Sequence, residues 1–453
     1  MEFAGKKVLV VGLGKSGLSV CRYLCGRGAV VTVSELRQKE ILDRSVIEGI
    51  ARIGAELEFG GHRPETFLGS EMIIVSPGVP LDIGPLNEAR DAGIPILGEM
   101  ELASRLIHIP IAAVTGTNGK STTTALLGAM AGQAGKRTFV GGNIGIPFID
   151  CVLDNSEAEV AVVEVSSFQL DAMKTFRPDI SMILNLSPDH LDRYRDYEAY
   201  VASKFRIFEN QGPGHFLILN DDDERLSRVR TDSGVGVLRY GLEARENRQA
   251  FLEKGKLRAS PPGGAPCEFA LGRFRLPGKH NLQNLMGAVL AGLVLGLGGG
   301  SIQETIDAFG GLPHRVEFVG RFRDVDFYDD SKATNVEAAA RSVEGFDRPV
   351  ILIAGGRHKG ADYGPLVEAS RGRVTEAVLL GESRDLLKKS FEGIVPIRTA
   401  ETMEEAVSLA FAAANPRDVV LLAPACSSFD MFTDYVHRGN VFRETVERVG
   451  HGR

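Results

Sequence analysis

Short apolar runs rich in β-branched residues recur along the whole chain, and glycine-rich turns and helical stretches follow most of them. This alternation is typical of α/β domains with parallel sheets. Ligands of such sheets bind beyond the carboxyl ends of the strands, so the residues that directly follow the runs are the first candidates for a functional role. The runs that predict strands are 7–11, 30–33, 72–75, 111–115, 160–165, 182–185, 216–220, 350–354, 377–380 and 419–423.

A chain of 453 residues has room for about three domains. One boundary is expected near Gly98, where a fresh strand and helix begin, and another near Gly311, after a glycine-rich turn and a short helix. We therefore predict domains at 1–98, 99–311 and 312–453. The segment 232–275 is polar and rich in glycine and proline, which favours an irregular or hairpin insertion late in the middle domain.

The composition indicates a folded cytoplasmic protein. Hydrophobic residues make up 43% of the chain and charged residues 25%, close to the globular average. The net charge of −7 argues against a general nucleic-acid surface. The five cysteines are scattered without a CxxC pair, which suits a reducing compartment. The amino terminus lacks the apolar core of a signal peptide, and the apolar stretch 288–297 is too short to span a bilayer, so we expect no membrane insertion.

The first strand runs into Gly12-Leu-Gly-Lys-Ser-Gly17, and Glu35 follows the second strand. The pattern is typical of a turn that brings backbone N–H groups at a helix N-terminus to the diphosphate of a dinucleotide. Any nucleotide diphosphate would satisfy the same physics, and a tight structural turn would also explain the glycines. The motif alone leaves the ligand open.

The segment 111–122 carries the strongest motif, an apolar strand followed by Gly-Thr-Asn-Gly-Lys-Ser-Thr and a helix. It has the layout of a phosphate-binding loop, in which backbone N–H groups surround the phosphates, Lys120 reaches the outer phosphates and Ser121 meets Mg²⁺. Val114 stands where the usual spacing has its first glycine.

Such a loop needs an acid that holds the metal, and Glu164 follows an apolar run at a strand end. A solvated acid would fit there as well. His190 follows another strand and is a candidate for a second ligand, although a lone histidine in a loop is more often unliganded.

Lys204 falls on the apolar stripe of a helix, together with Tyr197, Tyr200 and Val201. A free ammonium group is costly in that position. Either the side chain extends its amine to water, or the amine is modified or paired with acidic groups.

Three polar loops follow strands in the last third of the chain, namely 329–335, 354–360 and 423–429. They contain small and hydroxyl residues, and the first two add lysines. Side chains of this kind at strand ends suit a carboxylate or a phosphate. Each loop alone could be only a polar connection, but three together favour a ligand site.

Segments from nearly the whole chain occur in the same order in one enzyme family. They are GTNGKST, EVSSFQL, SPDHLDRY, SKFRIFEN, GKHNLQN, GLPHR, DDSKATN, GGRHKGAD and PACSSFD. On these motifs the chain resembles the Mur ligases, cytoplasmic ATP-dependent enzymes of peptidoglycan synthesis. The amino-terminal GLGKSG motif and the DSKATN and PACSS loops make the resemblance closest to the members that add D-glutamate.

The resemblance implies three α/β domains: a Rossmann-like domain for a UDP-sugar, a central P-loop ATPase-like domain, and a Rossmann-like C-terminal domain for the amino acid. It implies that ATP phosphorylates the carboxylate of UDP-N-acetylmuramoyl-L-alanine and that the amine of D-glutamate attacks the resulting acyl phosphate. We expect a monomer.

The resemblance also implies roles for residues around ATP and two Mg²⁺ ions. Ser121 and Glu164 would hold one ion, and His190 and Lys204 the other, with Lys204 present as its carbamate. Carbamylation would turn a cation that repels Mg²⁺ into an anionic oxygen ligand. The implied catalytic residues are Lys120, His190, Lys204 and Lys332, and the implied nucleotide contacts are Gly116, Thr117, Asn118, Gly119, Lys120, Ser121, Thr122, Asn281, Asn284, Arg315 and Asp330.

The substrate residues follow from the same resemblance. The UDP-sugar would lie against Ser16, Glu35, Arg37, Ser76, Gly78 and Asn143, and D-glutamate against Lys332, Thr334, Lys359, Ser428 and Tyr435. Lysines and hydroxyl groups match the two carboxylates of that amino acid.

Two alternatives stay open. One is a related ligase that uses another amino acid, such as an L-alanine-adding or folylpolyglutamate-type enzyme. The other is an NAD-dependent oxidoreductase based on GLGKSG alone, which leaves GTNGKST and Lys204 unexplained.

Overall fold

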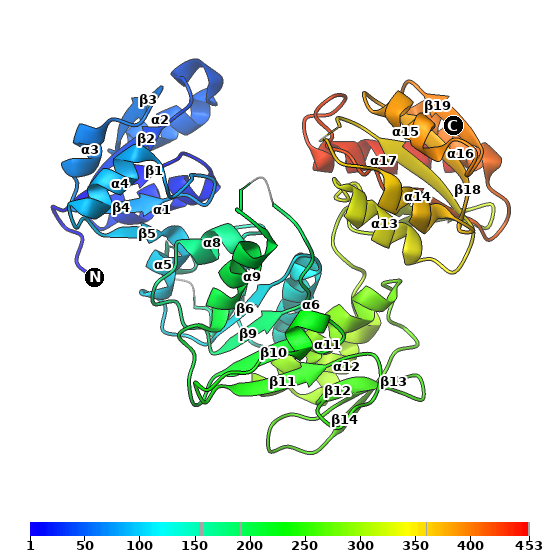
Figure 1. The fold of residues 1–453 in the computed structure, drawn as a ribbon, viewed down its shortest axis with the longest axis horizontal. Coiled ribbons are helices and arrows are strands. Elements are labelled where there is room, and N and C mark those ends of the chain that lie inside the picture. Colours follow the sequence, from blue (N-terminus) through cyan, green and yellow to red (C-terminus); the bar gives the residue numbers. More distant parts are fainter. Residues whose placement is uncertain (154–156, 191–192, 359, 452–453) are drawn as a thin grey trace. The chain divides into compact units, whose positions relative to one another are not determined.

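The computed structural model describes residues 1–153, 157–190, 193–358 and 360–451. They form two compact units, Met1–Leu271 with Gln283–Ile306, and Gly272–Leu282 with Asp307–Arg453. One boundary between the units falls inside helix α11 (Lys279–Val294) and another inside helix α12 (Gly299–Ala308). Helices and strands alternate along the chain (Figure 1), and the sheets are mostly parallel, which confirms the predicted α/β class.

The first unit begins with a parallel sheet of five strands in the order β3-β2-β1-β4-β5. Val8 and Val10 pack in one apolar cluster, and Leu9 and Val11 in another, so both faces of strand β1 are covered. Burial on both faces explains why this strand is an unbroken apolar run. The elements are β1 (Lys7–Val11), α1 (Lys15–Gly26), β2 (Val30–Glu35), η1 (Lys39–Ile41), α2 (Arg44–Arg52), β3 (Glu56–Phe59), α3 (Pro64–Leu68), β4 (Met72–Val75), α4 (Gly84–Asp91) and β5 (Ile96–Gly98).

The second sheet of this unit has nine strands in the order β14-β13-β12-β11-β10-β9-β6-β8-β7. The elements are α5 (Glu99–Ser104), β6 (Ile111–Thr115), α6 (Lys120–Gln133), β7 (Thr138–Gly142), α7 (Asp150–Leu153), β8 (Val160–Glu164), α8 (Ser167–Asp171), β9 (Ile180–Ile183), α9 (Tyr197–Phe205), η2 (Arg206–Phe208), β10 (Phe216–Asn220), α10 (Glu224–Ser227), β11 (Gly236–Tyr240), β12 (Ala250–Glu253), β13 (Lys256–Ala259), β14 (Cys267–Ala270), α11 and α12 (Gly299–Ala308).

The segment 232–275, expected as an irregular or hairpin insertion, continues the second sheet. Strand β11 pairs in parallel with both β10 and β12, and β12, β13 and β14 then pair antiparallel in turn. The side chains of Leu257 and Phe269, which face each other across β13 and β14, are buried. Alternating burial of single apolar residues builds these strands, so no continuous apolar run announces them.

The second unit contains a six-stranded sheet in the order β15-β16-β20-β17-β18-β19, parallel except for the antiparallel pair β15 and β16. Leu352 and Ala354 pack on one face of β17, and Ile351 and Ile353 on the other. The elements are β15 (Glu317–Phe322), β16 (Val325–Asp329), α13 (Val336–Glu344), β17 (Val350–Gly355), α14 (Gly364–Ser370), β18 (Val374–Leu380), α15 (Arg384–Phe391), β19 (Ile397–Ala400), α16 (Met403–Ala413), β20 (Val419–Leu422) and α17 (Tyr435–Gly450).

Every predicted strand coincides with an observed strand, but the run 182–185 was placed two residues too late. Strand β9 ends at Ile183. Asn185 lies beyond it, where its side chain exchanges two hydrogen bonds with the backbone of Asn118. A polar side chain that supports a neighbouring loop therefore continued the apparent strand.

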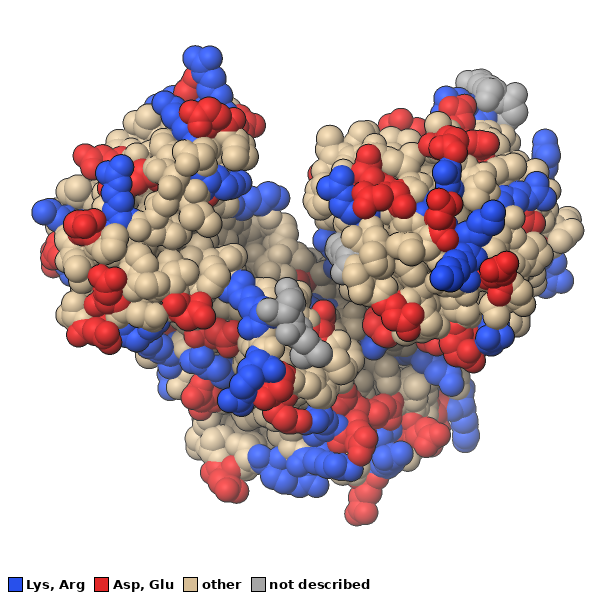
Figure 2. Space-filling model, turned by 45° about the horizontal axis from the view of Figure 1, so that its top comes forward, with Lys and Arg blue, Asp and Glu red and all other residues tan. Residues whose placement is uncertain are grey.

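The surface carries both signs of charge. On the face shown in Figure 2, basic and acidic side chains are intermixed, so the net charge of −7 does not form one acidic field there. Within the described ranges, each helix is too short or too polar to span a lipid bilayer.

Glu101 in α5 stabilises the start of the second sheet through hydrogen bonds to a distant loop. Its carboxylate is buried and accepts the backbone N–H groups of Lys174, Thr175 and Phe176, each at 3.1 Å, and the hydroxyl of Thr175 at 2.6 Å. Arg105 donates to it as well, at 2.6 Å. The carboxylate thus satisfies donors of a loop about seventy residues away.

We expect Glu101→Ala to lower the free energy of unfolding by about 2–4 kcal/mol, because several buried donors lose a charged acceptor. Urea denaturation followed by circular dichroism would measure this loss. The exposed Glu88 of α4 offers a control, since Glu88→Ala should change the same quantity by less than about 0.5 kcal/mol. Equal effects of the two substitutions would contradict this role of Glu101.

Candidate active site

The loop between β6 and α6 is shaped for close backbone approach. Gly116 has φ 147° and Gly119 has φ 84°. A Cβ atom at Gly119 would lie 2.2 Å from Oδ1 of Asn284, so this side chain packs directly against the loop. The N–H of Asn118 donates to Asn185, and the hydroxyl of Thr117 lies 3.1 Å from that of Tyr200. The predicted loop residues Gly116 to Thr122 therefore form one supported turn at the carboxyl end of β6.

Lys120 folds back over this turn. Its Nζ donates to the carbonyl oxygens of Gly116 and Thr117, both at 2.9 Å. An ammonium group held in this way lies at the mouth of a loop whose N–H groups suit phosphate oxygens.

Glu164 lies at the end of β8, beside the predicted metal residue Ser121. Its side chain is 2% exposed, and its Oε2 accepts the hydroxyl of Ser121 at 2.5 Å. Its Oε1 accepts Nδ2 of Asn143 at 2.7 Å. Asn143, predicted to contact the sugar-peptide, thus lies against the acid. Hard cations such as Mg²⁺ prefer oxygen donors, and Ser121 and Glu164 present such donors side by side, so the residues fit this ion.

Lys204 is fully inside the protein. Its side chain, on α9, is 2% exposed, and Nζ donates to the carbonyl oxygen of Gly116 at 2.9 Å. The same nitrogen lies 4.6 Å from the centre of the Tyr200 ring. Burial, and next the positive charge of Lys120, hold the pKa of Lys204 well below its usual range. The alternative in which the amine extends to water is wrong.

His190 lies at the rim of the same region with φ 54°. Its ring packs against Phe168 at 4.8 Å and faces Tyr200 at 6.4 Å, and its Nε2 is 3.7 Å from Asp189. His190 and Lys204, predicted for a second metal, thus contact the same tyrosine ring. The sequence placed Tyr200 on the apolar stripe together with Lys204, one helical turn before it, but predicted no role for Tyr200 at the site.

The first sheet places its predicted residues at strand ends. Glu35 ends β2, is 4% exposed, and accepts the N–H of Leu13 at 2.8 Å and the guanidinium of Arg37 at 2.9 Å. Burial opposes ionisation of Glu35, but the hydrogen bonds from Arg37 and Leu13 outweigh it and lower the pKa to about 2. Ser76 donates to the carbonyl oxygen of Gly12 at 2.8 Å.

The close contact of Gly12 and Ser76 sets the shape of the turn before α1. A Cβ atom at Gly17 would lie 2.1 Å from the Gly12 oxygen, so only glycine fits there. Ser16 is half-buried in the same turn, and Gly78 is exposed beyond β4.

In the second unit, Asp330 follows β16 and is buried. It accepts the hydroxyl of Ser342 and, at 3.3 Å, the N–H of Val316. Burial raises the pKa of Asp330 to about 7, although Ser342 and the charge of Arg315 act in the opposite direction. Arg315 and Asp330, both predicted nucleotide contacts, therefore interact within this unit.

The described residues that were predicted to bind D-glutamate also lie in this unit. Nζ of Lys332 lies 3.8 Å from the centre of the Tyr435 ring. Thr334 donates its N–H to the carbonyl oxygen of Lys332 at 2.7 Å, and Ser428 is 2% exposed. Lys359 lies outside the described residues.

Arg438 of α17 is a residue that sequence reasoning missed. Its guanidinium is buried and donates to Ser331 and to the carbonyl oxygen of Cys426. Burial lowers its pKa to about 10. It thereby joins the loop of Lys332 to the loop of Ser428. No sequence signal marks it, because an arginine in an amphipathic helix usually faces water.

The two predicted asparagines of α11 fall on either side of the division between the units. Asn281 belongs to the second unit, where its Nδ2 donates to the carbonyl oxygen of Pro277 at 2.7 Å, and Asn284 belongs to the first.

His314 also belongs to the second unit, and its Nδ1 lies 2.7 Å from a carboxylate oxygen of Asp329.

Three family models match the chain in sequence. They are the Mur ligase MurD-like N-terminal domain over residues 6–98, the Mur ligase middle domain over residues 114–292, and the Mur ligase glutamate ligase domain over residues 314–426.

Curated relatives match over almost the whole length. UDP-N-acetylmuramoylalanine–D-glutamate ligase of Desulfosudis oleivorans is 43% identical, covering 100% of this chain and 98% of the relative. The protein of the same name from Acidobacterium capsulatum is 44% identical, covering 98% and 97%.

Solved structures share the fold at lower identity. A pseudomurein peptide ligase type C from Methanothermus fervidus has a TM-score of 0.61 at 20% identity, covering 98% of this chain and 100% of that one. UDP-N-acetylmuramate-alanine ligase MurC from Thermotoga maritima has a TM-score of 0.59 at 19% identity, covering 99% and 100%.

The interaction of Glu35 with Arg37 predicts an acid-dependent stability. The pKa of Glu35 lies below its usual 4.5, so the carboxylate stabilises the fold above pH 4.5, and this contribution is lost as the pH falls towards 2. We expect Arg37→Ala to raise the pKa of Glu35 by more than about one unit, as observed by NMR of glutamate carboxyl carbons.

The matched control is Arg22→Ala, which removes an exposed arginine from α1. It should leave the pKa of Glu35 unchanged. A pKa that stays near 2 in Arg37→Ala would mean that Arg37 does not stabilise the carboxylate.

Proposed function

The chain belongs to the Mur ligase family, and on that premise we propose that it adds D-glutamate to UDP-N-acetylmuramoyl-L-alanine in an ATP-dependent reaction. The relatives that carry this activity in their names match the chain from end to end. We further propose that it acts in the cytoplasm as a monomer, with domains at 1–98, 99–311 and 312–453.

The observation that carries the proposal is the convergence of two amines on one backbone oxygen. Lys120 and Lys204 both donate to the carbonyl oxygen of Gly116, and Lys204 is buried. Two ammonium groups so placed repel each other, and burial adds a desolvation cost. The arrangement is favourable when Lys204 is neutral or carries an anionic group.

We propose that this group is a carbamate. The neutral amine of Lys204 attacks CO₂, an N–C bond forms, and the amine proton leaves to solvent. The product is an anion beside Lys120, which replaces repulsion by attraction. It also adds an oxygen donor near Ser121 and Glu164, and His190 is the proposed nitrogen donor of the second Mg²⁺ site. Bound Mg²⁺ would neutralise phosphate charge.

The proposed reaction has two steps. A carboxylate oxygen of the UDP-sugar attacks the γ-phosphorus of ATP, the bond to ADP breaks, and an acyl phosphate forms. The neutral amine of D-glutamate then attacks the acyl carbon, the C–O bond to phosphate breaks as the amide bond forms, and the amine loses one proton, so that hydrogen phosphate is released. Lys120 orients the outer phosphates from the turn Gly116–Thr122, and Asn281, Asn284, Arg315 and Asp330 are the other proposed nucleotide contacts.

We assign the two remaining substrates to strand ends. The uridine diphosphate is proposed to bind at Ser16, Glu35, Arg37, Ser76 and Gly78, where the N–H groups before α1 suit a diphosphate. D-Glutamate is proposed to bind at Lys332, Thr334, Lys359, Ser428 and Tyr435. The lysine side chains suit its carboxylates, and Arg438 supports two of the loops.

The proposed function predicts phosphate release that depends on D-glutamate. Purified protein would be incubated with ATP, Mg²⁺ and UDP-N-acetylmuramoyl-L-alanine, with D-glutamate, L-glutamate, L-alanine or diaminopimelate offered separately. We expect release with D-glutamate alone, together with a product heavier by one glutamyl residue. Release with another amino acid would retain the ligase chemistry and refute the substrate.

The carbamate predicts a signal that does not depend on turnover. Protein equilibrated with ¹³C-labelled bicarbonate should show a carbamate carbon in its NMR spectrum, and Lys204→Gln should lack it. Lys174→Gln, which alters an exposed lysine outside the site, is the control and should retain the carbamate signal. Activity of Lys204→Ala should fall by about 10²-fold or more, since a residue of the reaction centre is lost. Near-normal activity would exclude the assignment.

A further inference from the structure

Glu99 is a buried carboxylate with no part in the site described above. It is the first residue of α5, directly after the edge strand β5, and it is 1% exposed. Its Oε1 accepts the N–H of Ile149 at 2.7 Å. Within the described part of the chain its Oε2 has no hydrogen-bond partner. Burial raises the pKa of Glu99 to about 7 against the opposing effect of the Ile149 and Phe148 backbone N–H groups, and the charge of Asp150 adds to the rise.

A buried carboxylate with one unsatisfied oxygen is costly. An apolar residue would avoid that cost if the position served only packing. The hydrogen bond between Glu99 and Ile149 therefore indicates a role of this carboxylate beyond packing.

Ile149 ends a short loop whose beginning touches the proposed metal acid. Gly142 has φ 97°, and a Cβ atom there would lie 2.4 Å from the backbone oxygen of Glu164. Its N–H donates to Ile146 at 2.8 Å, which closes the loop on itself. Asn143 donates its N–H to the backbone oxygen of Glu164 at 2.9 Å and its Nδ2 to the carboxylate. The loop thus has two attachments, one to Glu164 and one to Glu99.

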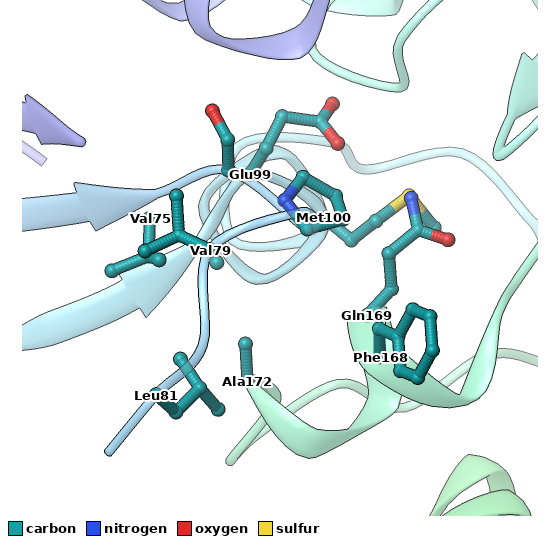
Figure 3. Close-up of a pocket in the computed structure, with 11 residues that line it drawn as sticks. Val75, Val79, Leu81, Glu99, Met100, Phe168, Gln169 and Ala172 are labelled. Carbon is teal, nitrogen blue, oxygen red and sulfur yellow. The ribbon is translucent and has the colours of Figure 1, made fainter. Parts of the chain in front are cut away.

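The surroundings of Glu99 leave little room for adjustment. Figure 3 shows Met100 next to Gln169 and the carboxylate of Glu99 directed away from Phe168 and Ala172, and these residues line a cavity of about 10 Å³. Such a volume holds at most about one water molecule. The N–H of Gly98 donates to Ala172, and a Cβ atom at Gly98 would lie 2.9 Å from that of Ala172. A shift of Glu99 therefore displaces the backbone of Ile149, which is bonded to it, because tightly packed interiors transmit displacements.

We infer that Glu99 is a positioning residue that sets the place of Glu164 through the loop Gly142–Ile149. The inference rests on the proposed function, in which Glu164 holds a divalent cation. It connects the end of the first sheet to the nucleotide site by a hydrogen bond, a loop of eight residues and the amide of Asn143. Glu99 itself touches no reacting atom.

The test measures metal binding without turnover. Mn²⁺, which accepts the same oxygen ligands as Mg²⁺, would be titrated into the full chain with ADP and followed by electron paramagnetic resonance. We expect Glu99→Ala to weaken Mn²⁺ binding by about tenfold, equal to about 1.4 kcal/mol. Glu99→Gln keeps an acceptor for the Ile149 N–H and should stay within about twofold of the unmodified protein.

Two further variants separate positioning from general stability. Glu101→Gln alters another buried acid of the same helix and should lower the melting temperature while leaving Mn²⁺ affinity unchanged. Asn143→Ala removes the side-chain hydrogen bond between the loop and the Glu164 carboxylate, while the backbone hydrogen bond to Glu164 remains. The effects of Glu99→Ala and Asn143→Ala should therefore be strongly non-additive, the double variant losing little more than the worse single one.

The outcomes are distinguishable. Unchanged Mn²⁺ affinity in Glu99→Ala, an equal loss in Glu101→Gln, or additive losses with Asn143→Ala would overturn the positioning role while the proposed function stands. If Glu99→Ala fails to fold, Glu99→Asp, whose shorter side chain withdraws the acceptor, replaces it with the same expectation. No Mn²⁺ binding by the unmodified protein with ADP would overturn the proposed function as well.

Discussion

The carbonyl oxygen of Gly116 accepts hydrogen bonds from Lys120 and Lys204. Two ammonium groups at one oxygen repel each other, and the first unit must accommodate this repulsion. The left-handed glycines of the loop expose the oxygen, and Asn185 and Tyr200 fix its neighbours. Helix α9 then delivers Lys204 from the apolar side, where its ammonium form is penalised by burial and by Lys120. In the proposed function, the lowered pKa of Lys204 distinguishes this amine, which is proposed to react with CO₂, from Lys120, which is proposed to bind phosphate. The deeper burial of Lys204, more than the spacing of the two lysines in sequence, supports these two proposed roles.

The fold could be predicted from sequence where a strand is buried on both faces. Strands β1, β6 and β17 are unbroken apolar runs because their residues alternate between two apolar clusters or layers that are both covered. The missed strands include the outermost strand of every sheet, β3 and β5, β7 and β14, β15 and β19. An edge strand has one neighbour and is often open to solvent on part of its surface, so polar residues interrupt it. Apolar runs therefore predict the central strands of a parallel sheet but not its edge strands.

The site shows the same division between local and distant information. The turn that is proposed to bind phosphate could be predicted because glycine, lysine and serine lie next to one another in the chain. The contact of Asn143 with Glu164 could not, since it depends on where β7 ends relative to β8. Arg438 was also missed, because it acts through Ser331 and Cys426, which only the folded second unit brings to it. Residues that touch a ligand lie in motifs, whereas residues that hold the motifs in place are scattered.

Helix α5 illustrates how similar residues acquire different meanings from their partners. Glu99 and Glu101 are two residues apart and both buried, yet the donors around Glu101 satisfy both its oxygens and lower its pKa, while Oε2 of Glu99 has no hydrogen-bond partner among the described residues and the pKa of Glu99 is raised. A fully satisfied carboxylate stabilises the structure by itself. A buried carboxylate with one unpaired oxygen carries a desolvation cost. A hydrogen bond that positions a neighbouring charged group would account for the presence of such a carboxylate. In this chain we infer that this neighbour is Glu164, because the loop Gly142–Ile149 is bonded to Glu164 through Asn143 and to Glu99 through Ile149.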